Sequence, residues 1–396
     1  MHNAHVKNTV RYYIIAAVLL LFLFFSNDFG AIDVQKTAIV TAVGIDRAEE
    51  EFIITSQIAV PQSSTQGKST QSVQLVSKGK TVADAFEEIN AKTGWYPKLV
   101  FCNLILLGKD TCTQDVFDAL DYFLLDEYLS DNCLVAACDG TAQAVLDADA
   151  LVDPSSSIAI GKILSSHAER VGTVLPSTLR SFSIGYFGES QSGFLPVIKI
   201  QPQQETEPEK TAANTQEESQ MPKKEQNSPV FSAEETALFV RGKRVGTLSP
   251  EETFAYGAVK NKLRLALYSA QTTDGVCTLN IKQNAPKIDL KVGKNGKANL
   301  KIELQLTAGL ADYSIAAPQE ELSDAGDVPD GTFYAAEKKL TGEIHSLFEK
   351  TKLLNCDIFG VRALLVKHGK RSDQKFAPEI LQNTQADIHV KFRNVR

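Results

Sequence analysis

A polar stretch between residues 201 and 230 divides this chain of 396 residues into two parts. The stretch reads QPQQETEPEKTAANTQEESQMPKKEQNSPV, with no aromatic residue and almost no large aliphatic one. Such a segment cannot bury enough apolar surface to offset the entropy cost of ordering it. We therefore expect a disordered linker over residues 201–230, an α/β region of one or two subdomains over residues 31–200, and an α+β domain over residues 231–396.

An uncharged apolar run, YYIIAAVLLLFLFF, lies between Tyr12 and Phe25. Lys7 and Arg11 precede it, and basic residues on this side predict that the N-terminus stays in the cytoplasm while the rest is exported. At about 1.5 Å per residue the run covers roughly 21 Å, which is short for a hydrocarbon core of about 30 Å. The residues expected to form the membrane anchor are Tyr12, Ile14, Ile15, Val18, Leu19, Leu20, Leu21, Phe22, Leu23, Phe24 and Phe25.

The length of this run is also typical of a cleaved signal peptide. However, the following residues, Ser26-Asn27-Asp28-Phe29-Gly30, do not offer the small side chains that a cleavage site needs. An uncleaved signal anchor over residues 1–30 is therefore favoured over cleaved secretion. A buried helix of a soluble protein ranks third, because a run without a polar face would need a core on all sides.

Hydrophobic periodicity predicts strands and helices in the first folded region. Two apolar runs joined by a short charged turn indicate a hairpin of Thr37–Ile45 with Phe52–Val60. Thr81 is expected to cap a helix that stops at Gly94. Further strands are expected at Ser72–Val76, Leu99–Leu107, Cys133–Cys138 and Phe194–Ile200, and further helices at Thr113–Leu125, from Thr141, at Pro154–Val171 and at Pro176–Phe182.

The second region begins with a predicted hairpin of Ala237–Val240 with Arg244–Leu248. Next, Ser249-Pro250-Glu251-Glu252 forms a capping box that opens a helix. Strict alternation over Ala298–Ala308 indicates a strand buried on one face of an antiparallel sheet. Strands at Val276–Ile281 and Ile288–Val292, a long helix at Phe333–Leu354 and a last alternating strand around Ala386–Phe392 complete the pattern. We expect a multi-domain α+β fold with mixed or antiparallel sheets and packed helices, after one N-terminal hydrophobic helix.

Charge and motifs argue against several functions. The net charge of −7 and the pI near 5.5 do not suit a nucleic-acid binder. P-loop, GxGxxG, HExxH and GxSxG motifs are missing from the sequence, and its six cysteines show no CxxC spacing. We expect free, buried cysteines, no enzymatic activity, no cofactor and no metal.

Four residue pairs are candidate sites, and a structural role is favoured for each. His167 with Glu169 and Asp118 with Asp121 suit exposed polar faces of helices better than catalysis. His345 with Glu349 has helical spacing but too few further ligands for a metal. Trp95 and Tyr96 are expected to pack, with an exposed aromatic patch for a partner as the alternative.

Several short motifs occur in an order that resembles the C subunit of spore germinant receptors, the Ger(x)C family. The most specific are AIVTAVGID at Ala38–Asp46 and CDIFG at Cys356–Gly360. Between them lie Gly79-Lys80-Thr81, the strand through Leu104–Leu107, Leu120-Asp121-Tyr122-Phe123-Leu124 and Val245-Gly246-Thr247-Leu248. The motif residues expected to be structurally important are Gly44, Asp46, Asp357, Phe359 and Gly360.

The resemblance implies a non-enzymatic subunit on the outer face of the inner spore membrane. It would act with an A subunit and a multispanning B subunit in sensing small nutrient germinants. Members of the family usually carry a lipid-modified cysteine directly after the apolar run, but Phe25-Ser26-Asn27-Asp28 contains none. The uncleaved helix is therefore expected to replace the lipid as anchor.

Two other classes of function stay open. A membrane-tethered extracytoplasmic solute-binding protein predicts a deep pocket lined by aromatic residues with a few convergent polar groups. An extracytoplasmic hydrolase predicts a nucleophile and a base within hydrogen-bonding distance, and the sequence nominates no such pair.

Overall fold

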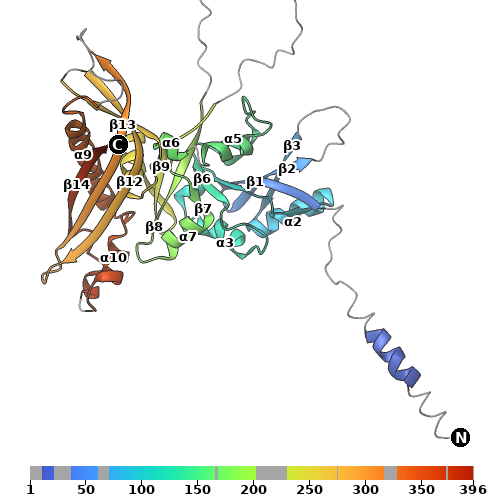
Figure 1. The fold of residues 1–396 in the computed structure, drawn as a ribbon. Helices are drawn as coiled ribbons and strands as arrows, with labels where there is room; N and C mark the ends of the chain where they lie inside the picture. The colour runs from blue at the N-terminus through green and yellow to red at the C-terminus, as the bar shows by residue number, and fades with distance from the viewer. Residues whose placement is uncertain are drawn as a thin grey trace, which may run out of the picture.

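Two β-sheets with packed helices form the body of the protein (Figure 1). The computed structural model describes residues 11–21, 37–60, 71–165, 168–201, 230–273, 275–315, 328–371 and 373–395. One sheet has ten strands and mixes parallel with antiparallel pairs, and the other has four. The prediction of an α+β fold with mixed sheets and packed helices is confirmed.

The first sheet has the strand order β10-β9-β8-β6-β5-β1-β2-β3, with β4 beside β1 and β7 beside β6. The predicted hairpin is confirmed, because β1 and β2 pair as antiparallel neighbours. Parallel pairs then link β1 to β5, β5 to β6 and β6 to β8. The strands are β1 (Thr37–Ala48), β2 (Glu51–Val60), β3 (Gln71–Gly79), β4 (Tyr96–Lys98), β5 (Leu104–Leu107), β6 (Leu134–Cys138), β7 (Ser177–Thr178), β8 (Ser192–Gln201), β9 (Val230–Val240) and β10 (Lys243–Leu248).

The strands on either side of the polar stretch are neighbours in this sheet. β8 ends at Gln201 and β9 begins at Val230, and these two residues are paired across the antiparallel ladder. Residues 202–229, which hold most of the predicted linker, lie outside the described residues. The two ends of the polar stretch thus lie side by side in the body. The strands β9 and β10, which follow the stretch in the sequence, complete the first sheet.

Helices cover both faces of the first sheet. Successive residues of β5 point to opposite faces, so Ile105 and Leu107 join one apolar cluster while Leu104 and Leu106 join another. Burial on both faces explains why the centre of this sheet is a continuous apolar run. The first face carries α2 (Val82–Thr93), α3 (Phe117–Leu125) and α7 (Leu179–Phe187), and the second carries α4 (Ala142–Asp147), α5 (Ser156–Ile163) and α6 (Ala168–Val171).

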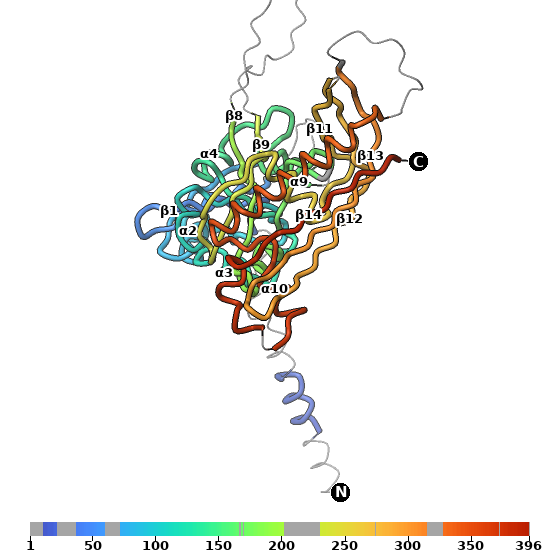
Figure 2. The backbone as a smooth tube through the Cα atoms, turned by 90° about the vertical axis from the view of Figure 1, so that its left-hand side faces the viewer, coloured from blue at the N-terminus to red at the C-terminus, as the bar shows by residue number. Residues whose placement is uncertain are grey.

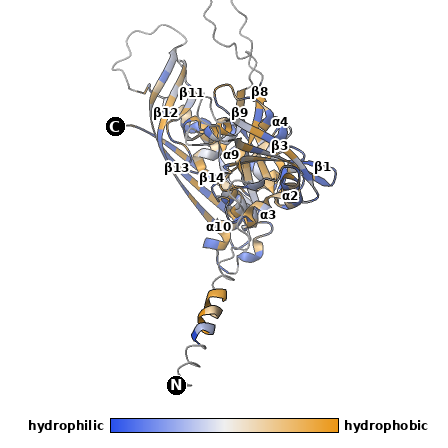
Figure 3. Cartoon of the chain, turned by 90° about the vertical axis from the view of Figure 1, so that its right-hand side faces the viewer, coloured by the Kyte–Doolittle hydropathy of each residue, from blue (hydrophilic) through white to orange (hydrophobic). Residues whose placement is uncertain are grey.

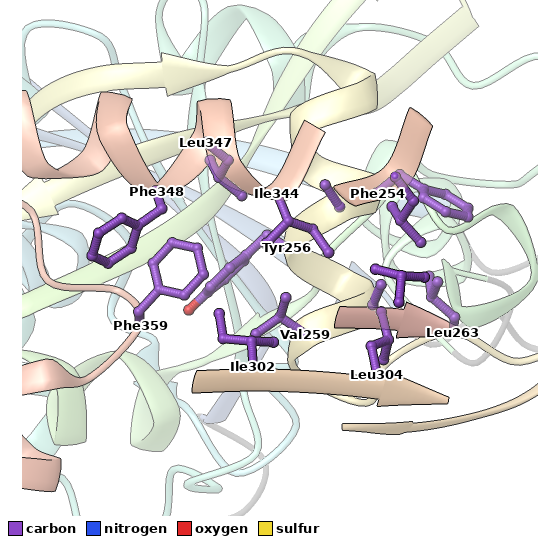
Figure 4. Packing of buried hydrophobic residues seen from close by; sticks show 14 of the residues in the cluster. Phe254, Tyr256, Val259, Leu263, Ile302, Leu304, Ile344, Leu347, Phe348 and Phe359 are labelled. Atoms are coloured by element: carbon purple, nitrogen blue, oxygen red, sulfur yellow. The ribbon is translucent and has the colours of Figure 1, made fainter. Parts of the chain in front are cut away.

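The second sheet has the strand order β11-β12-β13-β14. The one-face burial predicted over residues 298–308 is confirmed, since its apolar positions are all buried on the helix-covered face. The predicted antiparallel sheet is only partly right, because β13 pairs antiparallel with β12 but parallel with β14. Figure 2 shows α9 running along this sheet, and Figure 4 shows residues of α8 and α9 packed over Ile302 and Leu304. The elements are α8 (Pro250–Val259), β11 (Ala266–Gln271), β12 (Gly275–Val292), β13 (Ala298–Ile315), α9 (Thr332–Leu353), α10 (Val361–His368) and β14 (Thr384–Asn394).

Local capping signals are confirmed. The Thr81 and Ser249 side chains cap α2 and α8, and both form complete capping boxes. Gly94 ends α2 with φ 70°, a left-handed conformation that glycine adopts without a steric cost. The six cysteines are all free and buried, as expected.

Several predicted boundaries were wrong. β5 begins at Leu104 because residues 99–102 form a turn that Cys102 N closes on Leu99 O at 2.8 Å. The helix α3 begins at Phe117 rather than Thr113. Pro154 and Pro176 were expected in the first turns of two helices, but they precede α5 and α7, whose N-caps are Ser155 and Thr178. Residues 154–171 hold two short helices instead of one.

The predicted membrane anchor is only partly described. Residues 11–21 form a helix with exposed side chains, and Figure 3 shows its apolar character. Phe22 to Phe25 lie outside the described residues. Within the part of the chain that the structure describes, no helix reaches the combination of length and apolar character needed to cross a membrane.

Candidate functional site

A cavity of about 290 Å³ lies between one end of the first sheet and the segments that end α8 and begin α10. One wall comes from α7 and the start of β8, and the other comes from the end of α8 and the segment before α10. The wall is largely apolar, with Phe182, Phe194 and Ile358, and its charged groups are Glu189, Lys260 and Asp357. The cavity therefore collects residues from both sides of the polar stretch, including three of the CDIFG motif: Asp357, Ile358 and Gly360.

Asp357 organises the segment before α10. Its carboxylate accepts hydrogen bonds from Val361 N at 2.7 Å and Arg362 N at 2.8 Å, the first backbone groups of that helix. It also accepts one from Ser190 Oγ at 2.8 Å, and its own backbone N donates to Ser192 Oγ at 2.9 Å. The Asp357 carboxylate thus satisfies the first backbone N–H groups of α10, whose N-cap residue is Gly360, and links this helix to the chain just before and within β8.

Burial controls the charge of this carboxylate. Asp357 is only 2% exposed, and loss of water raises its pKa above the usual 3.8 even though hydrogen bonds from Arg362 N, Ser190 and Val361 N act in the other direction. Lys260 lies nearby with its Nζ 5.4 Å from the ring centroid of Tyr256. Surrounding protein atoms lower the pKa of Lys260, and the charge of Asp357 opposes that shift.

Phe359 and Gly360 fix the rest of the motif. The ring of Phe359 meets Tyr256 and Phe348 edge to face, with centroid distances of 5.9 Å and 5.3 Å (Figure 4). Tyr256 in turn donates its hydroxyl to Ile358 O at 2.8 Å. Gly360 has φ 79°, a conformation that costs other residues roughly 1–2 kcal/mol. The motif residues therefore pack the core and shape the start of α10.

Asp46 plays a matching part in the first sheet. Its carboxylate accepts hydrogen bonds from Ala142 N at 2.8 Å and Gln143 N at 2.9 Å, which begin α4. A Cβ at Gly44 would lie 3.0 Å from Ala142 Cβ, so glycine allows the close approach of this helix. Burial is the largest influence on Asp46 and raises its pKa, with the charge of Asp110 acting in the same direction.

Two of the candidate pairs, Asp118 with Asp121 and His345 with Glu349, lie on exposed helix surfaces where other contacts or solvent surround them. Asp118 accepts an ion pair from Arg47 at 3.5 Å, Asp121 is exposed, and His345 is an exposed residue of α9. His167 lies outside the described residues. Among the described residues there is also no group of three or more His, Cys, Asp or Glu side chains that could hold a metal ion.

The structure corrects one sequence prediction and adds residues that the sequence did not indicate. Trp95 and Tyr96 are 48% and 40% exposed, so the expected packing is wrong and the exposed aromatic alternative holds. Sequence reasoning also missed Ser190, Ser192 and Lys260. Ser190 and Ser192 meet their partner Asp357 across 167 and 165 residues, a separation at which no sequence pattern links them.

The two parts of the chain match two domains of one family of spore germination proteins. Residues 30–200 match the family described as "Spore germination protein N-terminal domain", and residues 234–396 match "Spore germination B3/ GerAC like, C-terminal". The chain belongs to the GerAC-like family of spore germination proteins. The resemblance seen in the motif order is thereby confirmed.

A solved structure has the same fold as this family member. It is described as "Crystal Structure of the GerBC protein", with a TM-score of 0.51 and 17% sequence identity. The match covers 89% of this chain and 97% of that chain. A comparison with curated protein sequences found no match.

Proposed function

We propose that this chain is a non-enzymatic, membrane-tethered subunit of a spore nutrient-germinant receptor, acting with an A subunit and a B subunit in germination signalling. The observation that carries this function is the match of both parts of the chain to spore germination domains. The fold shared with GerBC agrees with it. The contacts of the CDIFG motif also agree with it, because Asp357 and Gly360 shape the start of α10 and Phe359 packs in the core.

The membrane tether is the second element of this function. The apolar run from Tyr12 to Phe25 follows Lys7 and Arg11, a charge order that directs the body to the outside of the membrane. The helix over residues 11–21 carries exposed apolar side chains, as a lipid-facing helix does. We place the body on the outer face of the inner spore membrane.

The cavity does not favour a solute-binding protein over this function. Its volume of about 290 Å³ lies at the small end of ligand pockets, which hold roughly 300–1,000 Å³. The described surface instead exposes large aromatic side chains such as Trp95, Phe101 and Tyr128. Exposed apolar groups of this kind are typical of surfaces that meet another macromolecule or a membrane.

Deletion of the gene tests the function directly. We expect slower germination in response to nutrients, normal sporulation, and recovery when a wild-type copy is returned. Antibody capture of the full chain from dormant-spore membranes should also bring down the A and B subunits. Unchanged germination with every nutrient, in a strain that has no second copy, would sink the proposal.

A further inference from the structure

Four exposed aromatic side chains lie in or next to β4 and in the loop after α3 that Lys98 contacts. Trp95 is 48% exposed, Tyr96 40%, Phe101 61% and Tyr128 59%. We call these four residues the aromatic rim. Aromatic side chains of this size are seldom gathered on a surface that meets only water, so the rim is expected to have a partner.

Contacts of the backbone and of Lys98 hold the rim together. Tyr96 and Lys98 share one face of β4, because side chains two apart in a strand point the same way. The Lys98 Nζ lies 4.9 Å from the ring centroid of Tyr128, which joins β4 to the loop after α3. Asp126 accepts from Tyr128 N at 2.8 Å and Leu129 N at 2.9 Å, so its carboxylate is already used in shaping that loop.

The position of the rim along the chain identifies its partner. β4 runs parallel to the first residues of β1, with Thr37 opposite Tyr96 and Ile39 opposite Lys98. The rim therefore lies where the chain arrives from the apolar segment that ends at Phe25. Residues 26–36 join the two, and at about 3.5 Å per residue they span at most roughly 40 Å.

We propose that the aromatic rim docks the body onto the surface of the lipid bilayer. Trp and Tyr rings favour the headgroup level of a membrane, where one side of the ring is apolar and the other is wet. The Lys98 ammonium supplies a cation for lipid phosphate, and its stem stays on Tyr128. Val100 and Leu125, 48% and 82% exposed, add apolar contact. This docking rests on the membrane tether proposed above.

Trp95 is a built-in reporter, because the chain contains one tryptophan. The full chain is reconstituted into vesicles of phosphatidylcholine and phosphatidylglycerol, with or without brominated acyl chains. We expect Trp95 to emit at a shorter wavelength than in the unfolded chain without detergent, and brominated lipid should quench this emission. Iodide should quench it several-fold less than in the chain without vesicles. The double variant Phe101→Ser/Tyr128→Ser should restore iodide quenching while the unfolding midpoint stays unchanged.

A matched control removes two exposed apolar side chains far from β4. The Tyr334→Ser/Leu353→Ser variant alters side chains of α9 that are 71% and 86% exposed, and it should behave as the wild type.

The outcomes separate docking from the tether. In one outcome, the chain co-sediments with vesicles while iodide still quenches Trp95 and brominated lipid does not. That result would overturn docking but not the tether, and the rim would then be a surface for a protein partner. A chain that does not co-sediment would overturn both. Equal loss of shielding in the rim and control variants would also overturn docking.

Discussion

Asp46 and Asp357 place the same chemistry in two different regions. Each is a buried carboxylate that accepts hydrogen bonds from two consecutive backbone N–H groups at the start of a helix. Such groups have no partner within the helix, and a carboxylate also suits the positive end of the helix dipole. Asp46 caps α4 from 96 residues away, whereas Asp357 caps α10 from 4 residues away.

Asp357 also makes a hydrogen bond that spans more of the chain than any bond of Asp46. Its carboxylate also accepts from Ser190, 167 residues earlier, at the wall of the cavity. Asp46 therefore holds a helix to its own sheet, while Asp357 ties the C-terminal part of the chain to the N-terminal part. The same residue type secures a fold in one place and a junction in the other.

The largest effect is expected from Asp357→Ala. Three donors lose their acceptor, and bonds to a charged acceptor are each worth roughly 1.5–3 kcal/mol, so the loss in the free energy of unfolding should reach about 4.5 kcal/mol. Denaturant unfolding gives this value, and hydrogen exchange should show the start of β8 and α10 opening together. The exposed Asp330→Ala is the control and should stay within about 0.5 kcal/mol.

A somewhat smaller loss is expected from Asp46→Ala. Two donors, Ala142 N and Gln143 N, lose their acceptor, which corresponds to about 3 kcal/mol in the same unfolding measurement. Faster hydrogen exchange should be confined to α4 and its neighbouring strands, while α10 stays protected. Equal exposure of α10 in this variant would show that the two aspartates do not act on separate regions.

The sequence predicted the parts of this arrangement that depend on near neighbours. The Thr81 and Ser249 capping boxes close within three residues, and the alternation over residues 298–308 follows from the strand period. Asp46 and Asp357 were singled out only as motif residues. Their bonds to α4 and to Ser190 depend on how the whole chain folds, which a local pattern does not contain.

Pro286 gives a second lesson about context. The sequence predicted two separate strands, Val276–Ile281 and Ile288–Val292, on either side of Pro286. A proline lacks the N–H that a central strand needs. The structure has one strand, β12, from Gly275 to Val292. Its neighbour β11 pairs only with residues 276–281, which leaves one side of β12 open at Pro286 while β13 pairs on the other. The proline is tolerated because β12 is an edge strand at that point.

Ser190→Ala should separate the two tasks of Asp357. It removes one hydroxyl donor from the junction and leaves both backbone bonds to α10, so the expected loss is about 1 kcal/mol. The matched variant in the other region is Thr141→Ala, which removes the hydroxyl that accepts from Ala144 N beside Asp46 and costs about 1 kcal/mol. Hydrogen exchange should report loosening at the start of β8 for the first and in α4 for the second. A Ser190→Ala variant that instead exposes α10 would contradict the separation.

The smallest effects are expected in the pH dependence of stability. The pKa of both carboxyls is raised above 3.8, so the folded protein keeps a proton that the unfolded chain has already lost. Unfolding then releases a proton, and the free energy of unfolding contributed by each group falls as pH rises from 3.8 through its folded pKa. The fall amounts to about 1.4 kcal/mol per unit of pKa difference.

Neighbouring charges of opposite sign should move these two falls in opposite directions. Asp110 raises the pKa of Asp46, so Asp110→Asn should make the pH-dependent decrease in the free energy of unfolding smaller. Arg362 lowers the pKa of Asp357, so Arg362→Gln should make it steeper. Both changes are expected to stay below about 1 kcal/mol, and urea unfolding across a series of acidic to neutral buffers measures them. If both variants shifted the profile in the same direction, burial and hydrogen bonding alone would set the difference between the two aspartates.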